Sequence, residues 1–75
     1  MSKRIAAVAM SRRIGETFDA IVTGVTDSGT FVRTLDPYVE GLLAQGKEGL
    51  DVGDRVRVKL VRTDVERGFI DFVRA

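Results

Sequence analysis

The chain has 75 residues and a net charge of +1, and it contains no cysteine and no histidine. At this length we expect one small domain, which buries only about 60–65% of the surface of its unfolded chain. The missing residue types exclude disulfides, thiolate nucleophiles, histidine bases and ordinary zinc sites. The longest apolar run near the start, Ile5 to Met10, is too short for a membrane span or a signal-peptide core, so we expect a cytoplasmic chain with no membrane partner.

Charge is unevenly distributed along the chain. Residues 1–13 carry four basic side chains and no acidic one, whereas in residues 14–75 the acidic side chains outnumber the basic ones. Residues 14–75 nevertheless contain a second basic group, which consists of Arg55, Arg57, Lys59 and Arg62. Two basic groups on an otherwise acidic domain are suited to a phosphate backbone, although a solvated arm and a solvated strand face explain the same pattern.

Residues 2–13 have the pattern of a short helix. The segment is rich in alanine, and its larger apolar residues recur at helical spacing. Ser2 is suited to cap the N-terminus of this helix, and Gly15 is suited to end the helix. Because nucleation is costly, a single short helix is weak unless it packs against other structure. We expect residues 1–14 to form a lead-in helix or linker, which either frays or belongs to a preceding domain.

A β-hairpin is predicted next. Residues 17–26 alternate in the manner of a half-buried strand. Gly29, which can adopt a positive φ, ends the turn that follows. Residues 30–35 are rich in β-branched and aromatic side chains and form the second strand. Asp36 and Pro37 end that strand, because proline lacks the donor that a sheet requires. A hairpin is not stable alone, so further strands must cover it.

Three more strands are predicted, over residues 38–43, 54–63 and 69–74. In the first of these, Gly41 indicates either a bulge or a close approach of another backbone. The glycine-rich loop of residues 44–53 is expected to place Leu50 and Val52 in the core.

Alternation also predicts which faces are buried. The apolar face of the fourth strand is formed by Val56, Val58 and Leu60. Its opposite face is basic and is formed by Arg55, Arg57 and Lys59. In the fifth strand we expect Ile70 and Phe72 to be buried, because Asp71 on the other face is costly to bury.

Five short strands with corners marked by glycine are typical of a small barrel. Closure into a barrel removes the exposed strand edges on which other chains pair. We therefore predict an all-β fold, namely a five-stranded OB-fold barrel over residues 15–75 with a short N-terminal lead-in helix.

Three ordered groups of residues resemble the S1-type RNA-binding domain. The first group comprises Gly15, Phe18, Ala20, Val22, Val25, Gly29, Phe31 and Val32. The second comprises Val39, Glu40, Gly41 and Leu42. The third comprises Val52, Gly53, Asp54, Val56, Val58, Lys59 and Leu60, followed by Asp64. The resemblance covers nearly the whole chain in the correct order.

Two longer segments are similar to the C-terminal S1 domain of the RNase II family of exoribonucleases, which includes RNase R. They are residues 50–58 (LDVGDRVRV) and residues 63–72 (TDVERGFIDF). This resemblance implies an accessory S1 domain that binds single-stranded RNA for a 3′–5′ exoribonuclease. The implied partners are the RNA and the catalytic domain of the parent enzyme, and no cofactor is implied. Because the hydrolytic carboxylates would lie in that other domain, the chain itself is not expected to be an enzyme.

The sequence departs from the S1 pattern at three positions of the usual RNA-contact patch. Ser28 stands where the family carries an aromatic residue, Ala44 stands near a usual histidine, and Phe69 aligns with a common arginine. The patch members that the resemblance carries over are Phe31 and Asp64.

Phe31 is the main candidate for RNA binding. An aromatic ring exposed on a barrel face can stack on a base of any identity. The alternative is a core position for Phe31, which would force the adjacent Val32 to face outward. Arg33 lies on the same side of the strand as Phe31, and its role is either a phosphate contact or a solvated strand position.

Four further residues are candidates for RNA contact. Arg57 and Lys59 face away from the core, where they either meet phosphate or are merely solvated. Arg67, in the last hairpin loop, is a weaker phosphate candidate. Asp64 either holds this loop by accepting backbone donors or bonds to a base edge, and the loop role is favoured.

Two other functional interpretations remain. A metal-dependent nuclease needs several converging acids, but the aspartates here fall mostly at scattered turns, which argues against catalysis in this chain. The second alternative is a degenerate OB barrel that acts as a structural or protein-docking domain. Ser28 and Phe69 favour it, because both replace expected RNA-contact residues.

Overall fold

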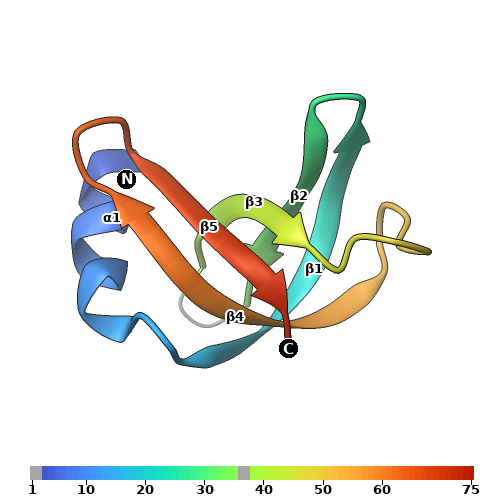
Figure 1. The fold of residues 1–75 in the computed structure, drawn as a ribbon, viewed down its shortest axis with the longest axis horizontal. Helices are drawn as coiled ribbons and strands as arrows, with labels where there is room; N and C mark the ends of the chain where they lie inside the picture. Colours follow the sequence, from blue (N-terminus) through green and yellow to red (C-terminus); the bar gives the residue numbers. More distant parts are fainter. Residues whose placement is uncertain (1–2, 36–37) are drawn as a thin grey trace.

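The computed structural model of the protein describes residues 3–35 and 38–75, so the predicted cap at Ser2 and the predicted break at Asp36 and Pro37 lie outside the described residues. Helix α1 and a 3-10 turn precede five strands (Figure 1). The elements are α1 (Lys3–Met10), η1 (Ser11–Arg13), β1 (Thr17–Thr26), β2 (Gly29–Thr34), β3 (Glu40–Gln45), β4 (Arg55–Asp64) and β5 (Phe69–Arg74).

The five strands close into a barrel in the order β1-β2-β3-β5-β4. Neighbouring strands are antiparallel except β3 and β5, which run parallel. The predicted OB-fold barrel is confirmed. The largest error in a strand boundary is in β3, which begins at Glu40, two residues later than predicted.

The barrel core is built from the alternating apolar side chains that the sequence predicts. Its members from β1, β4 and β5 are Phe18, Ala20, Val22, Val56, Val58, Leu60, Ile70 and Phe72. The rings of Phe18 and Phe72 meet edge to face with centroids 6.4 Å apart. Such pairs contribute beyond the area that they bury.

Gly41 lies where β3 closely approaches β5. A Cβ atom on Gly41 would lie 2.5 Å from the carbonyl oxygen of Ile70 and 2.6 Å from the ring of Phe72. No L side chain fits this space without a shift of the backbone. Of the two interpretations of this glycine, the close backbone approach is therefore correct, since the β2–β3 register runs through Gly41 without a bulge.

The loop between β3 and β4 differs from its prediction at one residue. Leu50 packs against the core as expected, but Val52 is 59% exposed. The Asp51 side chain accepts a hydrogen bond from the Val52 N–H (2.8 Å), and the Gly53 N–H donates to the Val22 carbonyl (2.8 Å). These bonds tie the tight turn to β1, and Val52 lies on its solvent side.

Helix α1 packs against the barrel at β4 and β5. Figure 1 shows it beside the hairpin that joins these two strands. Ala7 and Met10 are fully buried and belong to the same hydrophobic cluster as the barrel strands. No helix in the described part of the chain is long and apolar enough to span a membrane.

Candidate nucleic-acid interface

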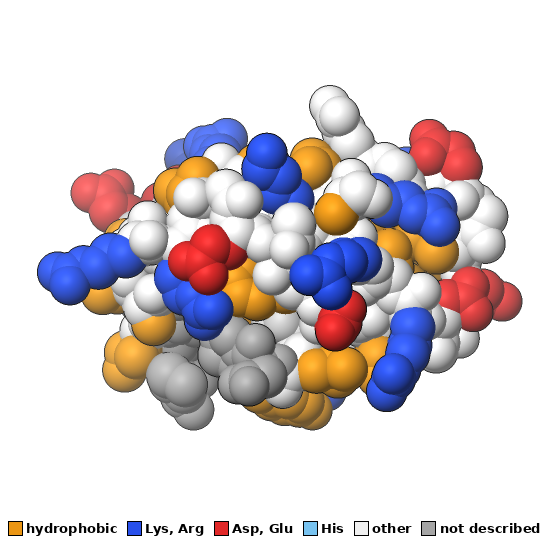
Figure 2. Space-filling model, turned by 90° about the horizontal axis from the view of Figure 1, so that it is seen from below, with side chains coloured by type: hydrophobic (Ala, Val, Ile, Leu, Met, Phe, Trp, Pro, Cys, Tyr) orange, Lys and Arg blue, Asp and Glu red, His pale blue; other side chains and the backbone are white. Residues whose placement is uncertain are grey.

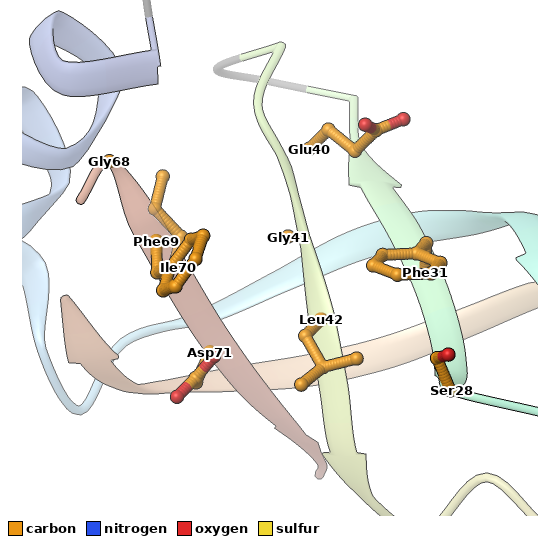
Figure 3. A pocket seen from close by; sticks show the side chains of 9 residues that line it. All are labelled: Ser28, Phe31, Glu40, Gly41, Leu42, Gly68, Phe69, Ile70 and Asp71. Atoms are coloured by element: carbon orange, nitrogen blue, oxygen red, sulfur yellow. The ribbon is translucent and has the colours of Figure 1, made fainter. Parts of the chain in front are cut away.

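A hollow of about 320 Å³ lies on the outer surface of the barrel across β2, β3 and β5 (Figure 3). This volume is at the small end of the range for ligand pockets. Its lining residues are Ser28, Phe31, Glu40, Gly41, Leu42, Gly68, Phe69, Ile70 and Asp71. The strand register explains the arrangement, because Phe31 lies opposite Leu42 and Leu42 lies opposite Asp71.

Phe31 faces outward into this hollow. Its neighbour Val32 is 0% exposed, so the alternation of β2 turns the Phe31 ring to the outer face, where it is half-buried. The core alternative for Phe31 is therefore wrong. Gly29 helps to shape the hollow, since its φ is +153° and a Cβ atom there would lie 2.7 Å from the Leu42 side chain. Base stacking by Phe31 stays a prediction.

Arg33 lies on the same face of β2 as Phe31, as its spacing predicts, but its guanidinium is already engaged. It donates hydrogen bonds to the Tyr38 hydroxyl (2.7 Å) and to Glu40 Oε2 (3.4 Å). Its Cζ atom also lies 4.8 Å from the centre of the Tyr38 ring. A phosphate that approached Arg33 would compete with Glu40 for the same charge.

Arg57 and Lys59 lie on a different side of the barrel. They face outward from β4 opposite β1, and β4 is not a neighbour of β2. Arg57 forms an ion pair with Asp19 (3.1 Å) and donates a hydrogen bond to the Thr17 hydroxyl (3.1 Å). The structure therefore does not bring these two residues together with Phe31.

Basic side chains are dispersed on the surface rather than gathered. Figure 2 shows the molecule from below the view of Figure 1, the side along which β4 runs. On this face the lysine and arginine side chains lie apart, with acidic and hydrophobic side chains between them. A dispersed positive charge favours a weak contact with phosphates over a tight electrostatic groove.

Asp64 and Arg67 lie at the hairpin that joins β4 and β5. Asp64 Oδ1 accepts a hydrogen bond from the Arg67 N–H (3.2 Å), and the two side chains approach to 4.0 Å. This geometry agrees with the loop role that the sequence favours for Asp64. The hairpin borders the hollow, because its Gly68 and the following Phe69 line it. Phosphate contact by Arg67 stays a prediction.

The sequence pattern does not indicate that Leu42, Phe69 and Asp71 belong to one site. The signal for Phe69 was present, since the alternation that buries Ile70 and Phe72 also turns Phe69 outward. The missing information was the parallel pairing of β3 with β5, which brings Phe69 and Asp71 to the side of the barrel that holds Phe31.

The polar lining of the hollow is acidic. Two carboxylates, Glu40 and Asp71, line it, and none of the described residues that line it is basic. Among the residues that the structure describes, no three His, Cys, Asp or Glu side chains come together as metal ligands. The chemistry available in this hollow is the stacking of flat rings, the acceptance of hydrogen bonds by the two carboxylates, and hydrogen bonding by the Ser28 hydroxyl, which both donates and accepts.

The family model of the RNase II-type exonuclease C-terminal S1 domain matches residues 16–75. The chain is 38% identical to a polyribonucleotide nucleotidyltransferase of Thermus thermophilus, over 96% of this chain and 11% of that protein. It is 34% identical to a ribonuclease R of Thermotoga maritima, over 85% of this chain and 12% of that protein. The chain thus spans about a tenth of the length of these relatives.

A solved structure of RNase R from Mycoplasma genitalium, in complex with ribose-methylated single-stranded RNA, has a similar fold. The TM-score is 0.83 with 19% sequence identity, over 97% of this chain and 15% of that chain. Identity at this level shows the shared barrel and not a shared set of contact residues.

Proposed function

Because the chain belongs to the RNase II-type exonuclease C-terminal S1 domains, we propose that it binds single-stranded RNA as the accessory domain of a 3′–5′ exoribonuclease. The observation that carries this proposal is the half-buried Phe31 ring, turned outward into a hollow on β2, β3 and β5. A ring in this position can stack on a base of any identity, which suits an enzyme that must hold RNA of any sequence.

Two similarities support an RNA partner. The RNase R of M. genitalium with the same fold is in complex with single-stranded RNA, and a ribonuclease R is among the relatives. In this proposal the parent enzyme's catalytic domain is the second partner, and the hydrolytic carboxylates lie there rather than in this chain. A cytoplasmic location follows from the RNA substrate.

Phosphate contacts supply the remaining affinity in this proposal. Lys59, Arg57 and Arg67 are exposed on the surface, whereas Arg33 is restrained by Glu40 and Tyr38. Because few basic side chains are available and only one ring stacks, we expect the isolated chain to bind RNA with a micromolar or weaker dissociation constant. The affinity should fall steeply with salt, because each phosphate contact releases a counterion.

Fluorescence anisotropy with a labelled oligoribonucleotide at several salt concentrations tests the proposal. We expect saturable binding that weakens with salt, and a loss of about 1–3 kcal/mol of binding free energy for Phe31→Ala. Val52→Ala is the matched control, because Val52 is an exposed apolar residue of the loop before β4 and does not line the hollow. Absence of saturable binding at low salt would contradict RNA binding.

A second candidate function is that of a structural or protein-docking barrel. The engaged state of Arg33, the Arg57–Asp19 ion pair and the acidic lining of the hollow favour it. Chemical-shift mapping separates the two candidates. Shifts on Phe31, Arg33 and Lys59 upon addition of RNA support RNA binding, and their absence supports the docking barrel.

A further inference from the structure

Phe69 is an aromatic residue that the fold does not use in its core. It begins β5, is 55% exposed, and lines the hollow that holds Phe31. The buried apolar side chains of β5 are those of Ile70 and Phe72. An aromatic ring exposed at the wall of a hollow is suited to binding a flat partner, since it presents apolar area at little entropic cost.

Phe31 and Phe69 lie on opposite sides of β3. Adjacent strands are about 4.8 Å apart, so β2 and β5, which flank β3, are separated by about 10 Å. Figure 3 shows the two rings on either side of Gly41, with Leu42 beside them. The absent side chain of Gly41 would point to the inner face, toward Phe72, so the β3 side chain that stands between the two rings on the outer face is that of Leu42. Phe31, Leu42 and Phe69 therefore give the hollow an apolar lining.

The polar groups of the hollow determine which flat partner fits. Glu40 Oε2 already accepts hydrogen bonds from Arg33 (3.4 Å) and Thr23 (3.5 Å). Asp71 is half-buried and lines the hollow, and within the described part of the chain its carboxylate has no hydrogen bond or ion pair. An ionised carboxylate only accepts hydrogen bonds, so the partner must donate to Asp71 and must not place a phosphate there.

Nucleobases differ in whether they can donate a hydrogen bond to the Asp71 carboxylate. Cytosine and adenine carry an exocyclic amino group that donates hydrogen bonds, whereas the corresponding position of uracil is a carbonyl acceptor. A base that stacks in the hollow with its amino group toward Asp71 satisfies the free carboxylate. A uracil in the same orientation places its carbonyl oxygen next to the Asp71 carboxylate, and both groups are hydrogen-bond acceptors.

We propose that Phe31 and Phe69 together hold one nucleobase of the bound RNA, and that Asp71 selects a base with an exocyclic amino group over uracil. This inference rests on the proposed binding of single-stranded RNA. It assigns Phe69 a direct role in binding. This residue stands where the S1 family commonly has an arginine. Arg62 lies opposite Asp71 in the β4–β5 register and is exposed, where it can meet the phosphate of the same nucleotide.

The test uses the 75-residue chain with labelled oligocytidylate and oligouridylate of about eight nucleotides, within the site size of one OB-fold. We expect the wild type to bind oligocytidylate more tightly. Phe69→Ala should weaken this binding roughly 5- to 100-fold, and Phe69→Tyr, which keeps the ring, should restore it. Asp71→Asn should reduce the preference for oligocytidylate, because an amide both donates and accepts.

The outcomes separate this inference from the proposed function. If Phe31→Ala weakens binding and Phe69→Ala does not, the shared base site is wrong and RNA binding stands. Equal binding of the two oligonucleotides by the wild type overturns the role of Asp71. Failure of the wild type to bind either oligonucleotide contradicts RNA binding itself. Thermal unfolding of each variant checks that the barrel is intact, and unchanged midpoints are expected for residues that face outward.

Discussion

Gly41 is a residue on which the closure of the barrel directly depends. Its missing side chain lets β3 approach the backbone of β5 and the ring of Phe72. Gly41 also lines the hollow, so one residue links the packing of the barrel with the candidate site.

We expect Gly41→Ala to lower the free energy of unfolding by about 1–3 kcal/mol, as overpacking of a core does. The new methyl group would meet a backbone oxygen, which cannot move aside as a flexible side chain can. Gly24→Ala is the control, because a Cβ atom there would lie 3.8 Å from its nearest neighbour, the Phe31 ring. Denaturant unfolding of both variants measures the difference, and equal stabilities would contradict this account of the closure.

Glu40 determines how much positive charge Arg33 offers to RNA. Glu40→Gln removes the ion pair at 3.4 Å and one negative charge at the hollow. We expect tighter RNA binding at low salt, with the slope of log K against log salt steeper by about 0.7, as for one added phosphate contact on a single strand. Glu48→Gln is the control, since it removes the same charge from an exposed loop. An equal effect of both variants would assign the change to net charge alone.

At the scale of elements, α1 depends on the barrel and covers part of it. Eight residues are too few for a stable isolated helix. Its buried residues Ala7 and Met10 contact the hydrophobic cluster of the barrel. We therefore propose that the helix folds together with the barrel, where the sequence predicts a lead-in helix or linker that either frays or belongs to a preceding domain.

Met10→Ala should lower the free energy of unfolding by about 2–5 kcal/mol, as other large-to-small changes in a core do. Met10 is fully buried, whereas Val8 on the same helix is exposed. Val8→Ala should therefore change stability little and serves as the control for helix propensity. Thermal unfolding by circular dichroism distinguishes the two variants, and a Met10→Ala midpoint equal to that of wild type would show that the helix does not support the barrel.

At the scale of the whole molecule, the fold places Arg57 and Lys59 of β4 away from the hollow. Both residues lie opposite β1, and Lys59 lies opposite Val73 near the end of β5, whereas the hollow is at the start of that strand. One short oligonucleotide in the hollow therefore does not reach Arg57 and Lys59, and only a longer strand can pass around the barrel to them.

We expect the double change Arg57→Gln and Lys59→Gln to leave the binding of an RNA of about four nucleotides unchanged. The same change should weaken the binding of an RNA of about sixteen nucleotides and reduce its salt dependence. Anisotropy titrations with both lengths test this, with Phe31→Ala as the reference variant that weakens both. Equal losses for the two lengths would show that the basic group and the hollow act on the same few nucleotides.

Local pattern alone was sufficient to predict the strands and their buried faces. In β4, apolar and basic residues alternate without interruption, so the inward position of Val58 and the outward position of Lys59 follow from the two-residue period of a strand. The outward position of Phe31 followed in the same way from its neighbour Val32. These features depend only on residues close together in the chain.

The tertiary structure decided which outward residues share a surface. The parallel pairing of β3 with β5 joins segments about thirty residues apart and brings Phe69 and Asp71 to the hollow of Phe31. The tertiary structure also separates Arg57 from Phe31, pairs Arg33 with Glu40 across β2 and β3, and buries Met10 under the packing of α1. A strand's own period determines the side to which each residue points, but only the pairing of strands determines its neighbours. For this protein the sequence therefore determined the barrel and its candidate ring, and the fold determined the composition of the site around that ring.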